Sequence, residues 1–175
     1  LIHEDPRPMV IDADALNLLA RDNIEVLRDA AAPRMLTPHP GEMARIETAY
    51  GLSPEAFSRR DRAETLAKRT GATVLLKGAR TVIAAADGQI PIAFNSTGCP
   101  GMATGGIGDT LTGLIAALAA GGSSLFDSAC TGSWINGRAA ELATRDGGRS
   151  DESLAASDLV TCYGEAFRDL ARGAF

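Results

Sequence analysis

The residues best suited to chemistry lie in a glycine-rich run over 95–109, which reads NSTGCPGMATGGIGD and ends in an acid. Apolar residues at helical spacing follow it, at Leu111, Leu114, Ile115 and Leu118. The run therefore leads into a helix N-terminus, where unpaired backbone N–H groups and the positive end of the helix dipole favour an anion. Gly105, Gly106 and Gly108 let the backbone approach that anion closely, so we predict that they form an anion hole.

Asp109 ends this run, beside the predicted anion, where a carboxylate is repelled by phosphate. One interpretation is a helix N-cap, worth about 1 kcal/mol. The other is a general base, which takes the proton from a hydroxyl group as it attacks a phosphate. Capping does not need so long a glycine-rich run, and the general base is therefore favoured.

Two familiar phosphate-binding signatures do not occur in the run. It contains no Gly-Lys-Ser/Thr, which excludes a Walker A loop, and its glycines do not fit the dinucleotide pattern G-x-G-x-x-G. The sequence therefore requires a different kind of glycine-rich nucleotide site.

Other polar side chains follow three predicted strands at the point where each strand ends. These residues are Asp12 and Asp14 after strand 9–11, His39 and Glu42 after strand 35–37, and Lys77 after strand 73–76. In open α/β sheets, ligands collect at the carboxyl ends of the strands. We therefore expect these side chains to share one cleft with the glycine-rich run.

Structural roles remain open for several of these residues. Asp12, Asp14 and Asn17 could each cap the helix or turn that follows. His39 lies between two prolines, and its imidazole could be structural or could donate to an amide or phosphate. Glu42 could stabilise the first turn of its helix through the dipole. Exposed cations between strands, such as those over 77–81, are often only solvated.

The elements that position these residues alternate as in a parallel α/β sheet. We predict strands over 9–11, 35–37, 73–76, 81–85 and 90–94, and helices over 15–27, 42–49, 54–69, 109–120, 125–144 and 158–170. The predicted buried positions of helix 54–69 are Ala56, Phe57, Ala63 and Leu66. The stretch 147–153 is predicted to be an exposed connection, and residues 1–175 form a single α/β domain.

Composition narrows the possible partners. The chain has 175 residues, of which 45% are hydrophobic and 22% charged, as in a globular domain. Its net charge of −5 argues against nucleic acid as a partner, and no apolar run approaches the ~20 residues that span a bilayer. Three widely spaced cysteines and two histidines favour reduced thiols over a disulfide frame or a zinc site. We expect a cytoplasmic protein without a membrane partner.

Four sequence blocks, in this order, resemble the ADP/ATP-dependent NAD(P)H-hydrate dehydratases, a branch of the ribokinase-like superfamily. They are IDADALN at 11–17, LTPHPGEM at 36–43, LLKGARTVI at 75–83, and the glycine-rich run with its continuation to Gly113. The resemblance covers about residues 10 to 170. Cys99 stands where the family pattern has Asn.

The resemblance implies a ribokinase-like α/β fold, with a mostly parallel central sheet flanked by helices. Members of the family carry a portion before the first block that includes strands of the central sheet. We therefore expect this chain to be the carboxyl-terminal part of the domain, without its N-terminal strands. Without those strands, a sheet edge and an apolar surface would be uncovered. We therefore expect that the chain forms a homo-oligomer or is part of a longer protein.

The resemblance also implies roles for the site residues. Asp109 is the catalytic residue and faces the substrate, which His39 also contacts, and Asp14 is a further candidate for substrate binding. The residues that line the nucleotide-binding site are Lys77, Gly78, Ala79, Arg80, Thr81 and Gly108. Glu42 helps to hold Mg²⁺, through water.

The implied reaction repairs NADH or NADPH to which water has added across the C5=C6 bond of the nicotinamide. ADP or ATP phosphorylates the C6 hydroxyl, and the ring nitrogen then expels phosphate. One alternative is a ribokinase-like kinase of a small alcohol, such as a vitamin precursor or sugar, which uses the same acid and anion hole. Another is a truncated fragment that binds nucleotide without turnover.

Overall fold

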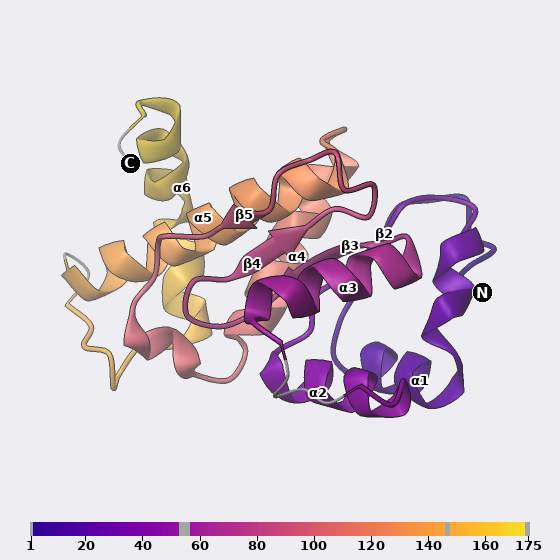
Figure 1. Cartoon of the computed structure of the whole chain (residues 1–175). Coiled ribbons are helices and arrows are strands. Elements are labelled where there is room, and N and C mark those ends of the chain that lie inside the picture. The colour runs from indigo at the N-terminus through magenta and orange to yellow at the C-terminus, as the bar shows by residue number, and fades with distance from the viewer. Residues whose placement is uncertain (1, 53–56, 146–147, 174–175) are drawn as a thin grey trace.

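The chain forms a five-stranded sheet with helices on both faces, seen in a computed structural model that describes residues 2–52, 57–145 and 148–173 (Figure 1). The strands, in spatial order, are β1 (Met9–Ile11), β2 (Arg34–Leu36), β3 (Thr73–Leu76), β4 (Val82–Ala84) and β5 (Ala93–Phe94). β1, β2 and β3 pair in parallel, whereas β4 is antiparallel to both β3 and β5. All strands but β4 therefore run in one direction, which confirms the predicted α/β class and the mostly parallel sheet.

Helices occupy most of the remaining described chain. They are α1 (Asp14–Asp22), α2 (Pro40–Ala49), α3 (Arg59–Thr70), α4 (Ile107–Ala120), α5 (Leu125–Arg145) and α6 (Ala156–Ala171), with 3-10 helices η1 (Ile24–Asp29) and η3 (Pro100–Ala103). In Figure 1, α3 lies over one face of the sheet, and α4 and α5 lie behind the other.

The strand sequences divide between these two faces because successive side chains of a strand point in opposite directions. Leu36, Val74 and Leu76 pack with the apolar residues of α1, η1, α2 and α3. Met35 and Leu75 belong to a second cluster with α4 and the start of α5. Both faces of the central strands are thus covered, which explains the adjacent apolar residues Met35-Leu36 in β2 and Val74-Leu75-Leu76 in β3.

Several predicted helices have different boundaries in the structure, and α2 and α6 each begin two residues before the predicted start. The predicted helix 15–27 is interrupted at Asn23, whose extended backbone and side-chain bond to the Glu25 amide begin η1. In the predicted helix 54–69, Ser58 accepts from the Asp61 amide, so α3 begins at Arg59. Phe57 lies before that helix and is 50% exposed, so its predicted burial is wrong. Ala56 lies outside the described residues.

Two predicted buried positions of α3 are confirmed, whereas the predicted start of α4 differs from the observed one. Ala63 and Leu66 are buried as predicted. α4 begins at Ile107, two residues before the predicted start, because Gly106 adopts a left-handed φ of 88° that ends the preceding turn. Much of the predicted connection 147–153 lies in the exposed stretch between α5 and α6, although residue 147 is outside the described residues.

The carboxyl ends of the first three strands are joined by hydrogen bonds. The Thr37 amide donates to the Ile11 carbonyl at 3.1 Å, and the Lys77 amide donates to the Pro38 carbonyl at 2.9 Å. These bonds continue the parallel pairing past the strand ends, so the segments that follow β1, β2 and β3 leave the sheet side by side. The polar residues on these segments are thereby brought to one edge.

Within the described chain, β1 has a strand partner on one side only. Self-association through this edge stays a prediction. None of the described helices combines the length and the apolar character that crossing a membrane requires.

Candidate functional site

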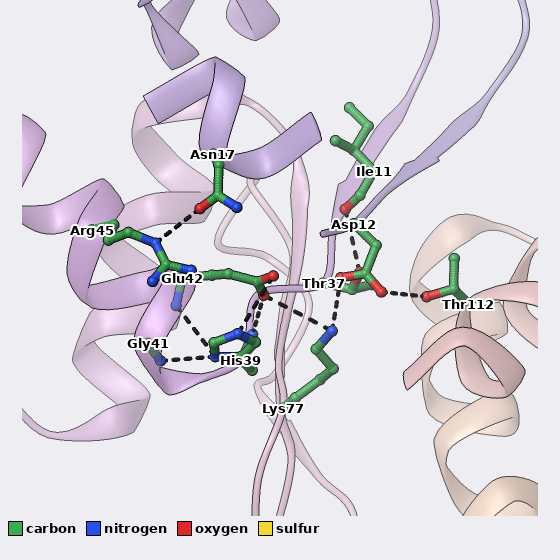
Figure 2. A network of polar contacts seen from close by, with 10 residues as sticks. All are labelled: Ile11, Asp12, Asn17, Thr37, His39, Gly41, Glu42, Arg45, Lys77 and Thr112. Carbon is green, nitrogen blue, oxygen red and sulfur yellow. Dashed lines mark hydrogen bonds and ion pairs between the residues drawn. The ribbon is translucent and has the colours of Figure 1, made fainter. Parts of the chain in front are cut away.

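Asp12 lies at the centre of the polar network at this edge of the sheet. Its carboxylate accepts a hydrogen bond from Lys77 Nζ at 2.7 Å and another from Thr112 Oγ1 at 2.8 Å (Figure 2). Burial opposes ionisation of this carboxyl, but the hydrogen bonds from Lys77 and Thr112 outweigh it and hold its pKa below the usual value. Asp12 therefore joins the segments after β1 and β3 to α4, and the predicted helix cap at this position is wrong.

Lys77 lies between two carboxylates and the first turn of α4. Its ammonium is 4.0 Å from Glu42 Oε2, in addition to its contact with Asp12. A Cβ atom on Gly108 would lie 3.5 Å from Lys77 Nζ. The lysine thus carries positive charge to the start of α4, where the helix dipole also favours an anion.

The start of α4 presents backbone donors without helical partners. The first backbone bond of this helix runs from the Thr110 amide to the Gly106 carbonyl, at 3.1 Å. The amides of Ile107, Gly108 and Asp109 precede it and have no acceptor inside the helix. Together with the Lys77 ammonium they form an electropositive surface for an anion such as phosphate.

Asp109 is the third residue of α4 and is exposed. The N-cap position belongs to Gly106, so the capping interpretation of Asp109 is wrong. Its carboxylate forms no hydrogen bond or ion pair with any side chain that the structure describes. It is therefore free to accept a proton from a molecule beside the electropositive surface.

Two glycines of the same run have structural tasks away from this helix start. The Gly98 amide donates to Glu141 at 2.9 Å, and the Gly101 amide donates to Asp151 at 2.9 Å. A Cβ on Gly101 would come within 3 Å of the Asp151 backbone. The first half of the run is thus held against α5 and the 148–155 connection. Only its second half forms the helix start.

His39 and Glu42 form a reciprocal cap at the start of α2. His39 Nδ1 accepts from the amides of Gly41 and Glu42, and Glu42 Oε2 accepts from the His39 amide at 2.8 Å. Nδ1 is therefore unprotonated in this arrangement, which places the proton of a neutral ring on Nε2. The structural role left open for each residue is thus present. The His39 side chain remains 49% exposed, so its ring can also reach a ligand.

The segment between β3 and β4 is the predicted nucleotide-binding segment 77–81. Gly78 has a φ of 138° and Arg80 a φ of 56°, whereas Thr81 is buried and donates to the Gly78 carbonyl at 3.2 Å. Arg59 of α3 donates to the carbonyls of Leu76 and Lys77 at 3.1 Å, and also to that of Ala79. The hydrogen bonds from Arg59 therefore hold this loop in one conformation.

The structure brings most of the predicted residues to one place. Lys77 contacts Asp12, approaches Glu42, and lies beside Gly108, while His39 joins through Glu42. Asp14 is exposed on α1 and makes no contact with this group. Asn17 also lies inside α1, where its side chain accepts from Arg45 at 2.8 Å, so it is not a cap (Figure 2).

Two residues of this region were not predicted from the sequence. Thr112 lies four residues after Gly108, which puts both on one face of α4, and this spacing is a usable signal. Arg59 is one of three arginines within four residues, and nothing in the sequence distinguishes it from Arg60 or Arg62.

The carboxylates near the start of α4 suit a metal ion that is held mainly by the oxygens of a bound phosphate and by only one or two protein side chains. Among the described residues, no group of three or more His, Cys, Asp or Glu side chains could hold a metal ion. Glu42 and Asp12 still offer carboxylate oxygens next to the electropositive surface. Mg²⁺ keeps several waters and is bound through one or two carboxylates plus phosphate oxygens, which this site fits.

A family model described as NAD(P)H-hydrate dehydratase matches residues 1–161. The chain belongs to the NAD(P)H-hydrate dehydratase family.

Curated relatives within the dehydratase family are longer than this chain. The bifunctional NAD(P)H-hydrate repair enzyme of Moorella thermoacetica is 46% identical over 165 residues, which are 93% of this chain and 30% of that protein. The ADP-dependent (S)-NAD(P)H-hydrate dehydratase of Neisseria meningitidis is 39% identical over 147 residues, covering 83% of this chain and 48% of the relative. The chain thus spans less than half of either relative.

Solved structures confirm the ribokinase-like fold of this dehydratase-family chain. The ADP/ATP-dependent NAD(P)H-hydrate dehydratase from Bacillus subtilis, co-crystallized with ATP/Mg²⁺ and soaked with CoA, has a TM-score of 0.80 and 30% identity. The match covers 95% of this chain and 58% of that one. Ribokinase from Thermotoga maritima has a TM-score of 0.54 at 14% identity, a likeness of fold alone.

Proposed function

We propose that this chain carries the nucleotide and catalytic residues for ADP- or ATP-dependent dehydration of hydrated NADH and NADPH. The observation that carries the proposal is the start of α4, where the Lys77 ammonium and free backbone amides adjoin the unpaired carboxylate of Asp109. An anion site with a free base beside it suits phosphoryl transfer from a nucleotide to a hydroxyl group. The family membership supports hydrated nicotinamide as the acceptor.

In the proposed reaction, Asp109 removes the proton from the C6 hydroxyl of the hydrated ring as its oxygen attacks the terminal phosphorus of ADP or ATP. The bond from that phosphorus to the bridging oxygen breaks, releasing AMP or ADP. The ring nitrogen lone pair then expels phosphate from C6, and loss of the C5 proton restores the C5=C6 bond. Phosphorylation is needed because hydroxide is a poor leaving group.

The anion hole and Lys77 act on the transferred phosphoryl group. The Gly105, Gly106 and Gly108 backbone, with its open first-turn amides, donates to the phosphoryl oxygens as charge develops on them. Lys77 adds a full positive charge at the same place. Because Asp12 already holds this ammonium, little side-chain freedom is lost when the phosphate binds.

The two substrates would approach from different sides of α4. The nucleotide lies along the loop Lys77, Gly78, Ala79, Arg80 and Thr81, whose first side chain, Lys77, lies next to Gly108. The hydrated nicotinamide lies on the side of Asp109 and the exposed His39 ring. Asp14 is exposed after β1 and is retained as a contact for a more distant part of this substrate.

Magnesium accompanies the nucleotide in this proposal. Glu42 would hold it through water, with its carboxylate already fixed by the His39 amide. When bound, the ion neutralises charge on the phosphates.

The experiment is to incubate the 175-residue chain with hydrated NADH, MgCl₂ and either ADP or ATP, while reduced-nicotinamide absorbance is followed. Recovery of absorbance with stoichiometric release of phosphate is the expected result. A stable phosphate ester of a small alcohol would indicate a kinase instead. Tight nucleotide binding without any product would indicate a fragment that binds but does not turn over.

A further inference from the structure

Arg59 connects α3 to the loop between β3 and β4 through its guanidinium group. Its terminal nitrogens donate to the carbonyl oxygens of Leu76 and Lys77, each at 3.1 Å, and to that of Ala79. These carbonyls belong to the segment between Leu76, where β3 ends, and Val82, where β4 begins. An arginine can satisfy them together because its donors form a planar fork.

The backbone of this loop is shaped around the guanidinium. A Cβ atom on Gly78 would lie 2.9 Å from an Arg59 terminal nitrogen, so a larger residue at this position would push the guanidinium aside. Gly78 has a φ of 138°, and Arg80 adopts the left-handed region at 56°. Carbonyl oxygens that converge on one cation repel one another in its absence, and the loop conformation therefore depends on Arg59.

Among the residues that the structure describes, no acid compensates the charge of Arg59. Within the described ranges 2–52, 57–145 and 148–173, no carboxylate lies within ion-pair distance of it. Three residues later on the same helix, Arg62 donates instead to both oxygens of Glu47, at 2.7 Å each. One helix thus carries two partly buried arginines with different partners, a loop for Arg59 and a carboxylate for Arg62.

We propose that Arg59 is a positioning residue for the nucleotide, acting through the backbone of the loop 77–80. This inference rests on the proposed function, in which the same loop lines ADP or ATP. By holding the Lys77 and Ala79 carbonyls, Arg59 fixes where the chain leaves β3. The Lys77 side chain then reaches the start of α4, and the loop amides keep one orientation toward the nucleotide.

The test compares Arg59→Met with the matched control Arg62→Met in the 175-residue chain. Binding of ADP with Mg²⁺ is measured by titration calorimetry, and folding by thermal unfolding and circular dichroism. Arg59→Met is expected to weaken ADP binding by about tenfold or more. Without Arg59 the loop must become ordered when ADP binds, and the entropy lost in that ordering reduces the net binding free energy. Arg62→Met is expected to lower the unfolding temperature while the dissociation constant for ADP stays within about twofold of wild type.

Kinetics provide a second readout that a general loss of stability would not produce. In Arg59→Met, KM for ADP should rise by about tenfold while kcat at saturating ADP changes by less than about threefold, because Asp109 is untouched. If Arg59→Met does not fold, Arg59→Lys supplies the comparison. Its single ammonium can reach only part of the carbonyl set, so an intermediate loss of ADP affinity is expected.

The outcomes separate this inference from the proposed function. Wild-type ADP affinity in Arg59→Met, or an equal loss of affinity in Arg62→Met, would overturn the positioning role. Wild-type chain that binds ADP but restores no reduced nicotinamide would overturn the proposed function, and the dissociation constants of the variants would still decide the role of Arg59. Wild-type chain that fails to bind ADP would overturn both.

Discussion

The Lys77 ammonium and the Asp12 carboxylate lie 2.7 Å apart although 65 residues separate them in the chain. Thr112 donates to the other oxygen of the same carboxylate at 2.8 Å. One acid thus orients the lysine and ties α4 to the end of β1. The proposed anion-binding surface at the start of α4 depends on both contacts, because its charge comes from Lys77 and its backbone donors from the helix.

Asp12→Asn should lower the free energy of unfolding by about 2 kcal/mol at pH 7, since hydrogen bonds to a charged group are weakened. The folded-state pKa of Asp12 lies below its unfolded value of about 3.9. Its stabilisation is therefore present above about pH 4 and is lost as the pH falls further. Urea unfolding of both proteins from pH 7 to pH 3 measures this. A difference that stays constant down to pH 3 would contradict it.

Asp109→Asn should lower the rate of dehydration by about 10²- to 10⁴-fold, the usual contribution of a general base. Thermal unfolding should be unchanged, because Asp109 is exposed and has no side-chain partner among the described residues. Asp61→Asn is a control for turnover, since Asp61 is also the third residue of its helix, and it should keep the wild-type rate even if loss of the bond from Ser58 Oγ lowers its stability. Wild-type turnover by Asp109→Asn would rule out the general-base role.

Gly108→Ala should weaken ADP binding by about tenfold while the fold is retained. The added methyl would lie 3.5 Å from Lys77 Nζ, an ordinary contact, yet it would occupy the space between the lysine and the open amides. Gly113→Ala on the same helix is the control, because no atom lies within 4 Å of its Cβ position. That variant should keep ADP affinity and gain about 0.5–1 kcal/mol of stability. Calorimetry and thermal unfolding of the two variants check both statements.

Cys130 should react slowly with iodoacetamide at pH 8 in the folded protein. Burial, with a smaller effect of Asp127, raises the pKa of this thiol to about 11, so only about one molecule in a thousand carries the thiolate. Unfolding in urea should restore rapid alkylation. Mass spectrometry of the peptide containing Cys130 after timed labelling measures the difference, and equal rates in the two conditions would refute the expectation.

Local sequence patterns were enough to locate the strands and most helices, although β5 (Ala93–Phe94) is shorter than the predicted strand 90–94. Adjacent apolar residues, Met35 and Leu36 in β2 and Leu75 and Leu76 in β3, pack on opposite faces of the sheet. Boundaries were less predictable where a single residue decides them. Asn23 and Ser58 each begin a new helix through a side-chain bond to a nearby amide, and both lie within continuous helical patterns in the sequence.

The candidate site also contains some features that the sequence predicted and others that it did not. The helix start after the glycine-rich run was predictable because the glycines, the apolar helical pattern and Asp109 are adjacent in the chain. The roles of Asp12 and Arg59 were not, because their partners are distant in the sequence: Asp12 bonds a lysine 65 residues away, and Arg59 bonds carbonyls of a loop 17 to 20 residues away. Capping is a reasonable expectation for an acid before a helix, and here a stronger charged donor competes for the carboxylate.

The sequence by itself determined the α/β class, the family, and the segments that carry polar groups, because apolar periodicity and glycine patterns are local properties of the chain. Only the tertiary structure decided which of those groups touch. Parallel pairing brings the carboxyl ends of β1, β2 and β3 together, and the packing of α4 beside β1 delivers Gly108 and Thr112 to Lys77 and Asp12. A hydrogen bond or ion pair requires contact within a few ångströms, and the folded backbone alone sets that distance.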